Sequence, residues 1–381
     1  MAGGGMYVLH DYLEMMRDGR RIDAFRAALR AAVRPGDAVM DVGAGTGVLS
    51  FLALEAGAGH VYAIEQLPVI EVARAVARGN GLADRITFIQ GDARNVELPG
   101  TVDCVMGDVR GTLPLIGDNV DLFAMTRERW LAPGGRTVPV RDVVSAAPVA
   151  ALAPHRAVAD WSTQRDRVRY EAARKIAANN WYAARLEPGD LLAAAQELAT
   201  VHYDRETPRR LGRNLSFIVE RDGEMTGVGA WFRAVVAEGI SFDTSPHSPP
   251  SVHSQAFFPL DEVRPVVAGE VIEVEIGIHR IPSDSIWTWT VASLGARPWR
   301  EAHSTFQGAL FGLNARELLV GNRIPALSAD GMAAAGLLRE IDGRTSVRDL
   351  AERISSQQPD RFPSADEALP YVMKIVARYC S

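Results

Sequence analysis

Residues 39–50 read Val-Met-Asp-Val-Gly-Ala-Gly-Thr-Gly-Val-Leu-Ser, an apolar run that passes into an acidic, glycine-rich turn and then a second apolar run. This order is typical of a buried strand, a turn and a helix. Gly43, Gly45 and Gly47 carry no Cβ, so a ligand can approach the backbone of the turn closely. Asp41 ends the expected strand and points a carboxylate into the same space. The stretch therefore predicts a loop that binds a nucleotide-like cofactor.

The carboxylate of Asp41 argues against a dinucleotide, because a pyrophosphate on the helix N-terminus would be repelled by it. S-adenosylmethionine (SAM) fits better, since it carries a sulfonium, an amino group and a ribose but no phosphate. A second strand at residues 60–64 ends in Glu65, followed by Gln66. A carboxylate about twenty residues after the glycine turn is placed to bind both ribose hydroxyls. We therefore predict SAM as the cofactor.

Two further apolar strands follow, at residues 86–90 and 102–106. The first is followed by Asp92 and Ala93, which suit the adenine amino group, and the second by Asp108. Ligands of doubly wound parallel sheets bind outside the carboxyl ends of the strands. Four such strands in series, each followed by an acidic residue, predict an α/β, Rossmann-like domain with an occupied crevice rather than an empty one.

Composition sets further limits on function. The chain has 381 residues, 47% of them hydrophobic, and a net charge of −6, which argues against non-specific binding of nucleic acid or anionic membrane. Cys104 and Cys380 make neither a disulfide framework nor a metal cluster, so we predict no metal. We recognise no signal peptide and no apolar run long enough to span a bilayer, so we expect a cytoplasmic protein.

The pattern divides the chain into three expected domains. A SAM-binding domain covers residues 1–140, with a helical pattern over residues 7–33, a helix end at residues 127–130 and a turn at residues 131–135. Residues 141–311 contain β-branched, alternating runs typical of an antiparallel β-barrel, with a helical arm at about 161–198.

The last expected domain, residues 312–381, reads as three short amphipathic helices at residues 332–341, 347–354 and 368–379. Ser346 is expected to cap the middle helix. The spacing of these helices resembles that of winged-helix domains of the PqqD type. That resemblance implies binding of a leader peptide in the biosynthesis of a ribosomal-peptide natural product; the alternative is a cap on the barrel.

Residues 7 to about 291 resemble the protein arginine methyltransferases. The likeness rests on the glycine loop, Glu65, Glu14-Met15 with Arg21 on the first helix, and the segments at residues 241–249 and 257–262, which flank that family's Thr-His-Trp motif. It implies a SAM-binding half followed by a β-barrel, an arm that makes a head-to-tail homodimer, and Arg21 at the cofactor's carboxylate.

Two departures from that family affect the expected substrate. The family holds the substrate guanidinium between two glutamates on the loop after the fourth strand, but here Asp108 stands at the first position and Gly117 at the second. The Thr-His-Trp motif reads Ser251-Val252-His253. Arginine is therefore not the first choice of acceptor. The loop resembles that of bacterial relatives with Ser-Asp-x-Arg-Gly-x-Leu-Pro.

The expected catalytic residues are Asp108, Arg110 and His253, and each has a structural alternative. Asp108 orients or deprotonates an acceptor amine, or caps its loop. Arg110 holds a substrate carboxylate or braces the loop. His253 lies in the barrel segment that reaches the mouth of the site, or it is structural.

The sequence thus predicts a SAM-dependent enzyme that methylates an amine of a peptide or protein. The alternatives are a small-molecule N- or O-methyltransferase, an arginine methyltransferase, and a SAM-binding module without activity.

Overall fold

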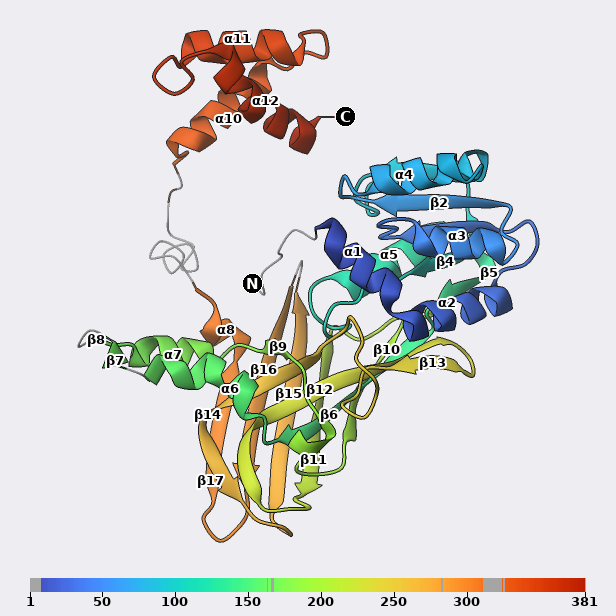
Figure 1. The fold of residues 1–381 in the computed structure, drawn as a ribbon. Helices are drawn as coiled ribbons and strands as arrows, with labels where there is room; N and C mark the ends of the chain where they lie inside the picture. Colours follow the sequence, from blue (N-terminus) through green and yellow to red (C-terminus); the bar gives the residue numbers. More distant parts are fainter. Residues whose placement is uncertain are drawn as a thin grey trace. The chain divides into compact units, whose positions relative to one another are not determined.

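The computed structural model describes residues 8–162, 164–165, 168–281, 284–310, 324 and 326–380 (Figure 1). The chain forms two compact units, Met1–Leu310 and Phe311–Ser381. In the first unit, a parallel sheet is followed along the chain by antiparallel sheets; the second unit contains helices. The predicted fold class is thereby confirmed.

The parallel sheet has the strand order β3-β2-β1-β4-β5. Its strands are β1 (Ala38–Val42), β2 (His60–Glu65), β3 (Ile86–Gln90), β4 (Val102–Gly107) and β5 (Leu131–Val138). The helices of this part are α1 (Leu9–Arg17), α2 (Gly19–Ala32), α3 (Val48–Glu55), α4 (Ile70–Gly79) and α5 (Asn119–Trp130), with a 3-10 turn η1 (Ala83–Arg85). The first four strands occur where the sequence predicts them.

Two details near this sheet differ from the sequence prediction. The helical pattern of residues 7–33 is two helices, because Asp18 ends α1 and its side chain accepts the backbone N–H of Arg21 to cap α2. The helix end expected at residues 127–130 is the end of α5, but residues 131–135, expected as a turn, begin β5. Their turn residues fit into the strand because the pairing of β5 with β4 is irregular between Val102 and Cys104.

The antiparallel part contains two large sheets, which share one core, and a two-stranded sheet of β7 (Gln164–Arg165) and β8 (Val168–Arg169). One large sheet has the order β10-β6-β12-β14-β9, with β13 beside β12, and the other has the order β11-β15-β16-β17. The rings of Phe258 on β14 and Trp289 on β16 lie 5.3 Å apart and join the sheets. The strands are β6 (Arg141–Val149), β9 (Tyr182–Ala184), β10 (Gln196–His202), β11 (Arg210–Ile218), β12 (Gly223–Ala237), β13 (Ile240–Asp243), β14 (Gln255–Val266), β15 (Val271–Ile281), β16 (Asp284–Ser293) and β17 (Trp299–Ser304).

The expected helical arm is shorter than residues 161–198. Its elements are α6 (Leu152–Ala159), η2 (Asp160–Ser162), the hairpin strands β7 (Gln164–Arg165) and β8 (Val168–Arg169), and α7 (Glu171–Ala177). The residues that follow α7 pair with the sheets instead, β9 with β14 and β10 with β6, because their apolar side chains are buried there. A 3-10 turn η3 (Pro188–Asp190) lies between them, and α8 (Thr305–Gly308) follows β17.

The second unit contains α10 (Ala329–Glu340), α11 (Val347–Gln357) and α12 (Ala365–Tyr379). Ser328, Ser346 and Ser364 cap these helices through their side chains, so the predicted cap at Ser346 is confirmed. The helices enclose a core of their own, which includes Leu337, Leu350, Ile354 and Val372. Residues 326–380 contain no strand that would form the wing of a winged helix. No described helix has the length and apolar character to cross a membrane, and the cytoplasmic location stays a prediction.

Candidate functional site

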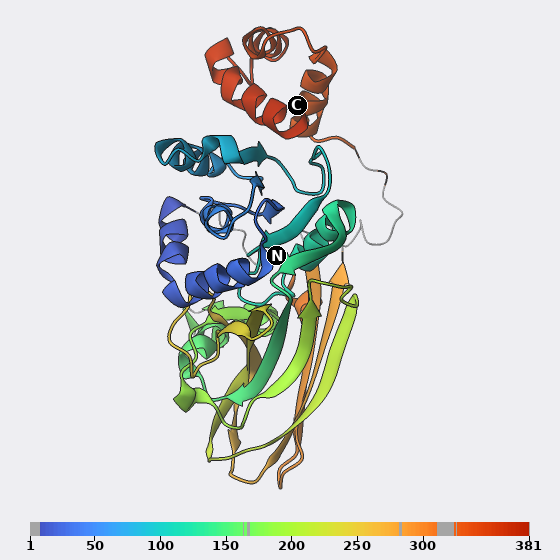
Figure 2. The ribbon, with the colours of Figure 1, turned by 90° about the vertical axis from the view of Figure 1, so that its right-hand side faces the viewer.

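A cavity of about 430 Å³ lies at the carboxyl ends of strands β1 to β4. Figure 2 shows the first unit turned by 90°, with the parallel sheet above the antiparallel sheets. The cavity wall includes these predicted site residues: Arg21, Gly43, Glu65, Gln66, Asp92, Ala93, Asp108, Arg110 and His253. The fold therefore gathers residues from six separate segments of the chain at one edge of the sheet, as expected for a doubly wound domain.

Glu65 is fixed in the cavity wall by two backbone groups. Its Oε2 accepts the N–H of Gly45 at 3.0 Å and its Oε1 accepts the N–H of Leu67 at 2.8 Å, and the residue is 8% exposed. Each carboxylate oxygen keeps a second lone pair for a ligand hydroxyl. Gly43 lines the cavity beside it with φ +73°, and a Cβ there would lie only 2.9 Å from Val109 Cγ1. This position requires glycine.

Three predicted cofactor residues, Asp41, Gly45 and Gly47, are not part of the cavity wall. Asp41 is fully buried, and its Oδ2 accepts the hydroxyl of Ser50 at 2.6 Å, so it holds the start of α3 instead of a ligand. This burial raises the pKa of Asp41 to about 7. Gly45 donates its backbone N–H to Glu65 and so helps to fix that side chain. Gly47 precedes α3 with φ +86°, a conformation that other residues adopt rarely.

Asp92 lies in the cavity wall but already has a partner, Arg94. The guanidinium of Arg94 donates to both oxygens of Asp92 and, at 2.8 Å, to Asp118 Oδ2. These hydrogen bonds lower the pKa of Asp92. Sequence analysis missed Arg94 as a site residue, although its position two residues after a strand-end aspartate was a usable signal. An adenine amino group at Asp92 would therefore meet a carboxylate that Arg94 also holds.

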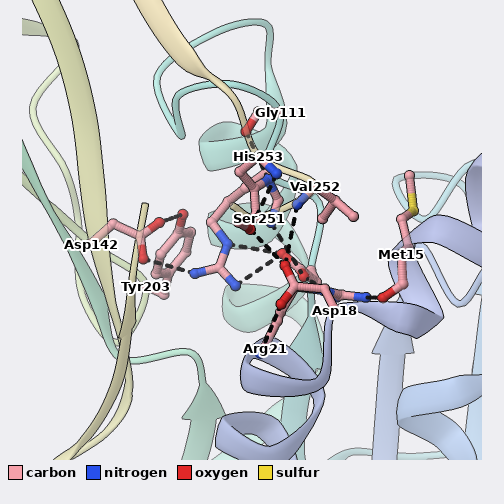
Figure 3. Close-up of polar contacts among 11 residues, drawn as sticks. Met15, Asp18, Arg21, Gly111, Asp142, Tyr203, Ser251, Val252 and His253 are labelled. Atoms are coloured by element: carbon pink, nitrogen blue, oxygen red, sulfur yellow. Dashed lines mark hydrogen bonds and ion pairs between the residues drawn. The ribbon is translucent and has the colours of Figure 1, made fainter. Parts of the chain in front are cut away.

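Asp108 directly follows β4, and its side chain, 8% exposed, lies between two arginines. Figure 3 shows Arg21 and Asp142, which belong to the same group of charges. Arg21 on α2 donates to Oδ2 of Asp108, and Arg110 Nε donates to Oδ1 of Asp108 at 2.9 Å. Burial favours the neutral acid, but attraction to Arg110 and Arg21 outweighs it and holds the pKa of Asp108 well below its ordinary value. Asp108 is therefore ionised at neutral pH.

Arg110 braces the loop after β4 against the antiparallel part of the fold. Its Nη1 donates to Asp142 Oδ1 on β6 at 2.8 Å, and the hydroxyl of Tyr203 donates to Asp142 Oδ2 at 2.7 Å. Sequence analysis missed both Asp142 and Tyr203, because no local motif marks them. With its side chain 1% exposed, Arg110 does not reach out to a substrate carboxylate. Of the two sequence interpretations, the structure supports the brace.

His253 lies in the cavity wall, but its ring is held on two sides. Its Nδ1 donates to the carbonyl oxygen of Gly111 at 3.1 Å, and its Nε2 lies 3.9 Å from Asp108 Oδ2. Phe242 stacks on the ring, with 6.2 Å between the ring centroids. Nε2 is buried and has no hydrogen-bond partner among the residues that the structure describes, so the contacts of His253 support the structural alternative, in which the ring attaches its segment to Gly111.

Residues 251–253, which stand where arginine methyltransferases carry the Thr-His-Trp motif, are attached to the N-terminal helices. Asp18 accepts the hydroxyl of Ser251 at 2.6 Å and the N–H of Val252 at 3.2 Å (Figure 3). Arg21 in turn donates to the carbonyl oxygen of Met15 at 2.7 Å. Helices α1 and α2 are thus fixed to both the cavity and the antiparallel part of the fold.

Part of the chain is similar to known methyltransferases. Residues 34–183 match the family model "Methyltransferase domain". Over 279 residues, which are 70% of this chain and 75% of the relative, the chain is 28% identical to the arginine N(omega)-methyltransferase of Streptomyces achromogenes subsp. streptozoticus. The chain carries a SAM-dependent methyltransferase domain. The probable protein arginine N-methyltransferase 6 of Arabidopsis thaliana is 33% identical over 138 residues, which span 32% of that relative.

Solved structures share the fold of this methyltransferase. The protein arginine methyltransferase 1 enzyme–prozyme complex of Trypanosoma brucei matches with a TM-score of 0.69 at 18% identity, covering 77% of this chain and 97% of that one. Protein arginine methyltransferase 10 of Arabidopsis thaliana matches with a TM-score of 0.68 at 20% identity, covering 78% and 98%. The predicted resemblance to arginine methyltransferases is thus confirmed.

The residues of the cavity fit SAM. Glu65 offers a carboxylate where a ribose is expected, and Gly43 leaves room along the backbone. The Nε of Arg21 is buried without a hydrogen-bond partner in the described part of the chain, so it can donate to the carboxylate of the amino-acid end. Tyr12 and Met15 on α1 complete the wall near Arg21.

Proposed function

We propose that this methyltransferase transfers a methyl group from SAM to the nitrogen of an amine in a peptide or protein. The observation that carries the proposal is Asp108, a buried and ionised carboxylate in the cavity wall at the end of β4. Such a group suits an acceptor that carries N–H bonds and becomes positively charged during the reaction.

Bound SAM supplies a methyl group on a positively charged sulfur, which the lone pair of an acceptor can displace in line. The chain's own contribution is positioning. Asp108 accepts an N–H of the acceptor and stabilises the positive charge that grows on the nitrogen. Its low pKa makes it a weak base, so this orienting role is favoured over proton removal. Arg21 and Arg110 hold Asp108 in place through hydrogen bonds to its two oxygens.

The guanidino nitrogen of arginine is the second candidate acceptor. It is favoured by the name of the Streptomyces relative, an arginine N(omega)-methyltransferase that aligns over 75% of its length. A guanidino nitrogen also carries N–H bonds that a carboxylate such as Asp108 can accept.

Mass spectrometry separates the two acceptors. The protein is incubated with SAM and two peptide pools, one whose only acceptors are lysine and α-amino groups and one that is rich in arginine but blocked at its amines. Methylation of amines supports the proposal, methylation confined to arginine supports the second candidate, and transfer to neither pool contradicts both.

The role of Asp108 is tested with Asp108→Asn, which keeps the shape of the side chain. Loss of the charge is expected to lower kcat at least about a hundredfold and to leave the Kd of SAM within several-fold. Asp84→Asn, at an exposed position in η1, is the matched control. Unchanged turnover in Asp108→Asn would remove Asp108 from the reaction.

We further propose that unit Phe311–Ser381 binds a leader peptide and that the protein is a homodimer. A separate core and exposed apolar side chains such as Met332 and Met373, 59% and 56% exposed, support the first proposal. Exposed Trp161 and Tyr170 on the arm support the second. Light scattering tests the dimer; a monomer at micromolar concentration contradicts it.

A further inference from the structure

The guanidinium of Arg110 is buried and held at two of its three nitrogens: Nε and Nη1 donate hydrogen bonds to carboxylates, whereas Nη2 has no hydrogen-bond partner within the described ranges of the chain. Its Nε and Nη2 each lie 2.9 Å from Asp108 Oδ1, and its Nη1 lies 2.8 Å from Asp142 Oδ1. The two carboxylates come from different parts of the fold, Asp108 from the end of β4 and Asp142 from β6. Carboxylates at two edges of a planar cation are the arrangement that recognises a guanidinium in particular.

Three aromatic rings complete the enclosure. The Cζ atom of Arg110 lies 5.5, 5.6 and 5.2 Å from the ring centroids of Phe25, Phe232 and Phe242. These distances are within the range of cation–π attraction. The rings belong to α2, β12 and β13, so the site is built by the tertiary structure and not by the loop that supplies Arg110. We call Asp108, Asp142 and the three rings the Arg110 cage.

We infer that Arg110 is an internal ligand that fills a guanidinium site at the acceptor end of the cavity, and that it thereby selects for amine over guanidinium acceptors. The inference deepens the proposed function and rests on it. Asp108 has one oxygen engaged by Arg110 and the other by Arg21. A substrate guanidinium would need two free carboxylate oxygens and would lie beside two positive charges. A neutral amine needs only one acceptor lone pair, which Asp108 retains.

The first test asks whether the cage binds a guanidinium once Arg110 is removed. Full-length Arg110→Ala is titrated with methylguanidinium in a thermal unfolding assay. Saturable stabilisation by millimolar methylguanidinium is expected, about tenfold tighter than by methylammonium, which cannot bridge both carboxylates. Wild type should show no saturable response, because Arg110 occupies the cage.

Arg280→Ala is the matched control. Arg280 is also buried, at 4% exposed, and donates to Asp121 Oδ1 at 3.0 Å, but no ring of the described residues stacks on it. No comparable stabilisation is expected for this variant. Equal responses of Arg280→Ala and Arg110→Ala would mean that methylguanidinium acts on any vacated arginine, which would overturn the cage.

Arg110→Gln keeps most of the packing in case Arg110→Ala does not fold. It removes the charge, so methylguanidinium is expected to bind it too, and absence of binding to the folded Gln variant overturns the inference. Arg110→Lys retains a charge in the cage and should not bind methylguanidinium.

The second test addresses selectivity. The ratio of arginine to amine methylation is measured with the two peptide pools for wild type and Arg110→Gln, and a rise of this ratio by about tenfold or more is expected. An unchanged ratio, despite methylguanidinium binding, would show that the cage does not set selectivity. If wild type methylates neither pool, the proposed function fails, whereas the binding test still decides whether the cage exists.

Discussion

The buried carboxylate of Asp142 offers a sharp test of how the two parts of the first unit are held together. Asp142 is fully buried and accepts two hydrogen bonds, from Arg110 at 2.8 Å and from Tyr203 at 2.7 Å. In Asp142→Ala both donors lose their acceptor. Each hydrogen bond to a charged group is worth about 1.5–3 kcal/mol, and removing one partner of a buried ion pair costs about 3–5 kcal/mol. The two hydrogen bonds together are worth about 3–6 kcal/mol, which agrees with the cost of breaking a buried ion pair, so we expect the free energy of unfolding to fall by about 3–5 kcal/mol.

Urea unfolding followed by tryptophan fluorescence measures this change. All seven tryptophans lie within residues 130–299, so the signal reports on the first unit without a contribution from the helices of the second. The midpoint is compared between wild type, Asp142→Ala and the exposed control Asp84→Ala, whose effect should stay within about 0.5 kcal/mol.

A double-mutant cycle isolates the contact with Tyr203. Tyr203→Phe removes the donor hydroxyl, so Asp142→Ala combined with Tyr203→Phe should cost less than the sum of the single changes, by about 0.5–3 kcal/mol. A loss below about 1 kcal/mol in Asp142→Ala would refute the reasoning, because a buried arginine would then tolerate the removal of one of its two carboxylates.

Three further predictions concern the cofactor site and the second unit. Burial raises the pKa of Asp41 from 3.8 to about 7, so its contribution to stability is fully present below about pH 4 and is lost as the pH rises to 7. The unfolding midpoint of wild type should therefore fall between about pH 4 and pH 7 relative to that of Asp41→Asn, and parallel curves for the two proteins would contradict this. Glu65→Ala should raise the Kd of SAM, measured by calorimetry, at least about a hundredfold, because two ribose hydroxyls lose a charged acceptor. Glu71→Ala, at an exposed position, should leave this Kd unchanged. Equal Kd values for the two variants would show that Glu65 does not bind SAM. Deletion of Phe311–Ser381 should leave the Kd of SAM unchanged. It should raise the KM of a peptide that carries a leader but not the KM of a short peptide without one. An equal change in KM for both peptides would argue against leader binding.

The sequence by itself determined the elements whose signals are local. Each strand of the parallel sheet up to β4 is an apolar run that ends at a glycine or a carboxylate, so its position and its polar end can be read without knowing its neighbours. The parallel arrangement then places Glu65, Asp92 and Asp108 at one edge. Ser346 is a similar case, because a helix cap depends only on the residues next to it.

Only the tertiary structure decided which polar groups meet. Asp41 looks like a ligand in the sequence, but the packing of α3 against β1 turns it toward Ser50. Asp142 lies 32 residues after Arg110, and Tyr203 lies a further 61 residues along the chain. Nothing in the local sequence marks either residue. Their contact with Arg110 forms because an enclosed guanidinium must find acceptors wherever the fold brings a carboxylate close. Periodicity predicts the elements of this protein, whereas long-range burial of charge determines its site.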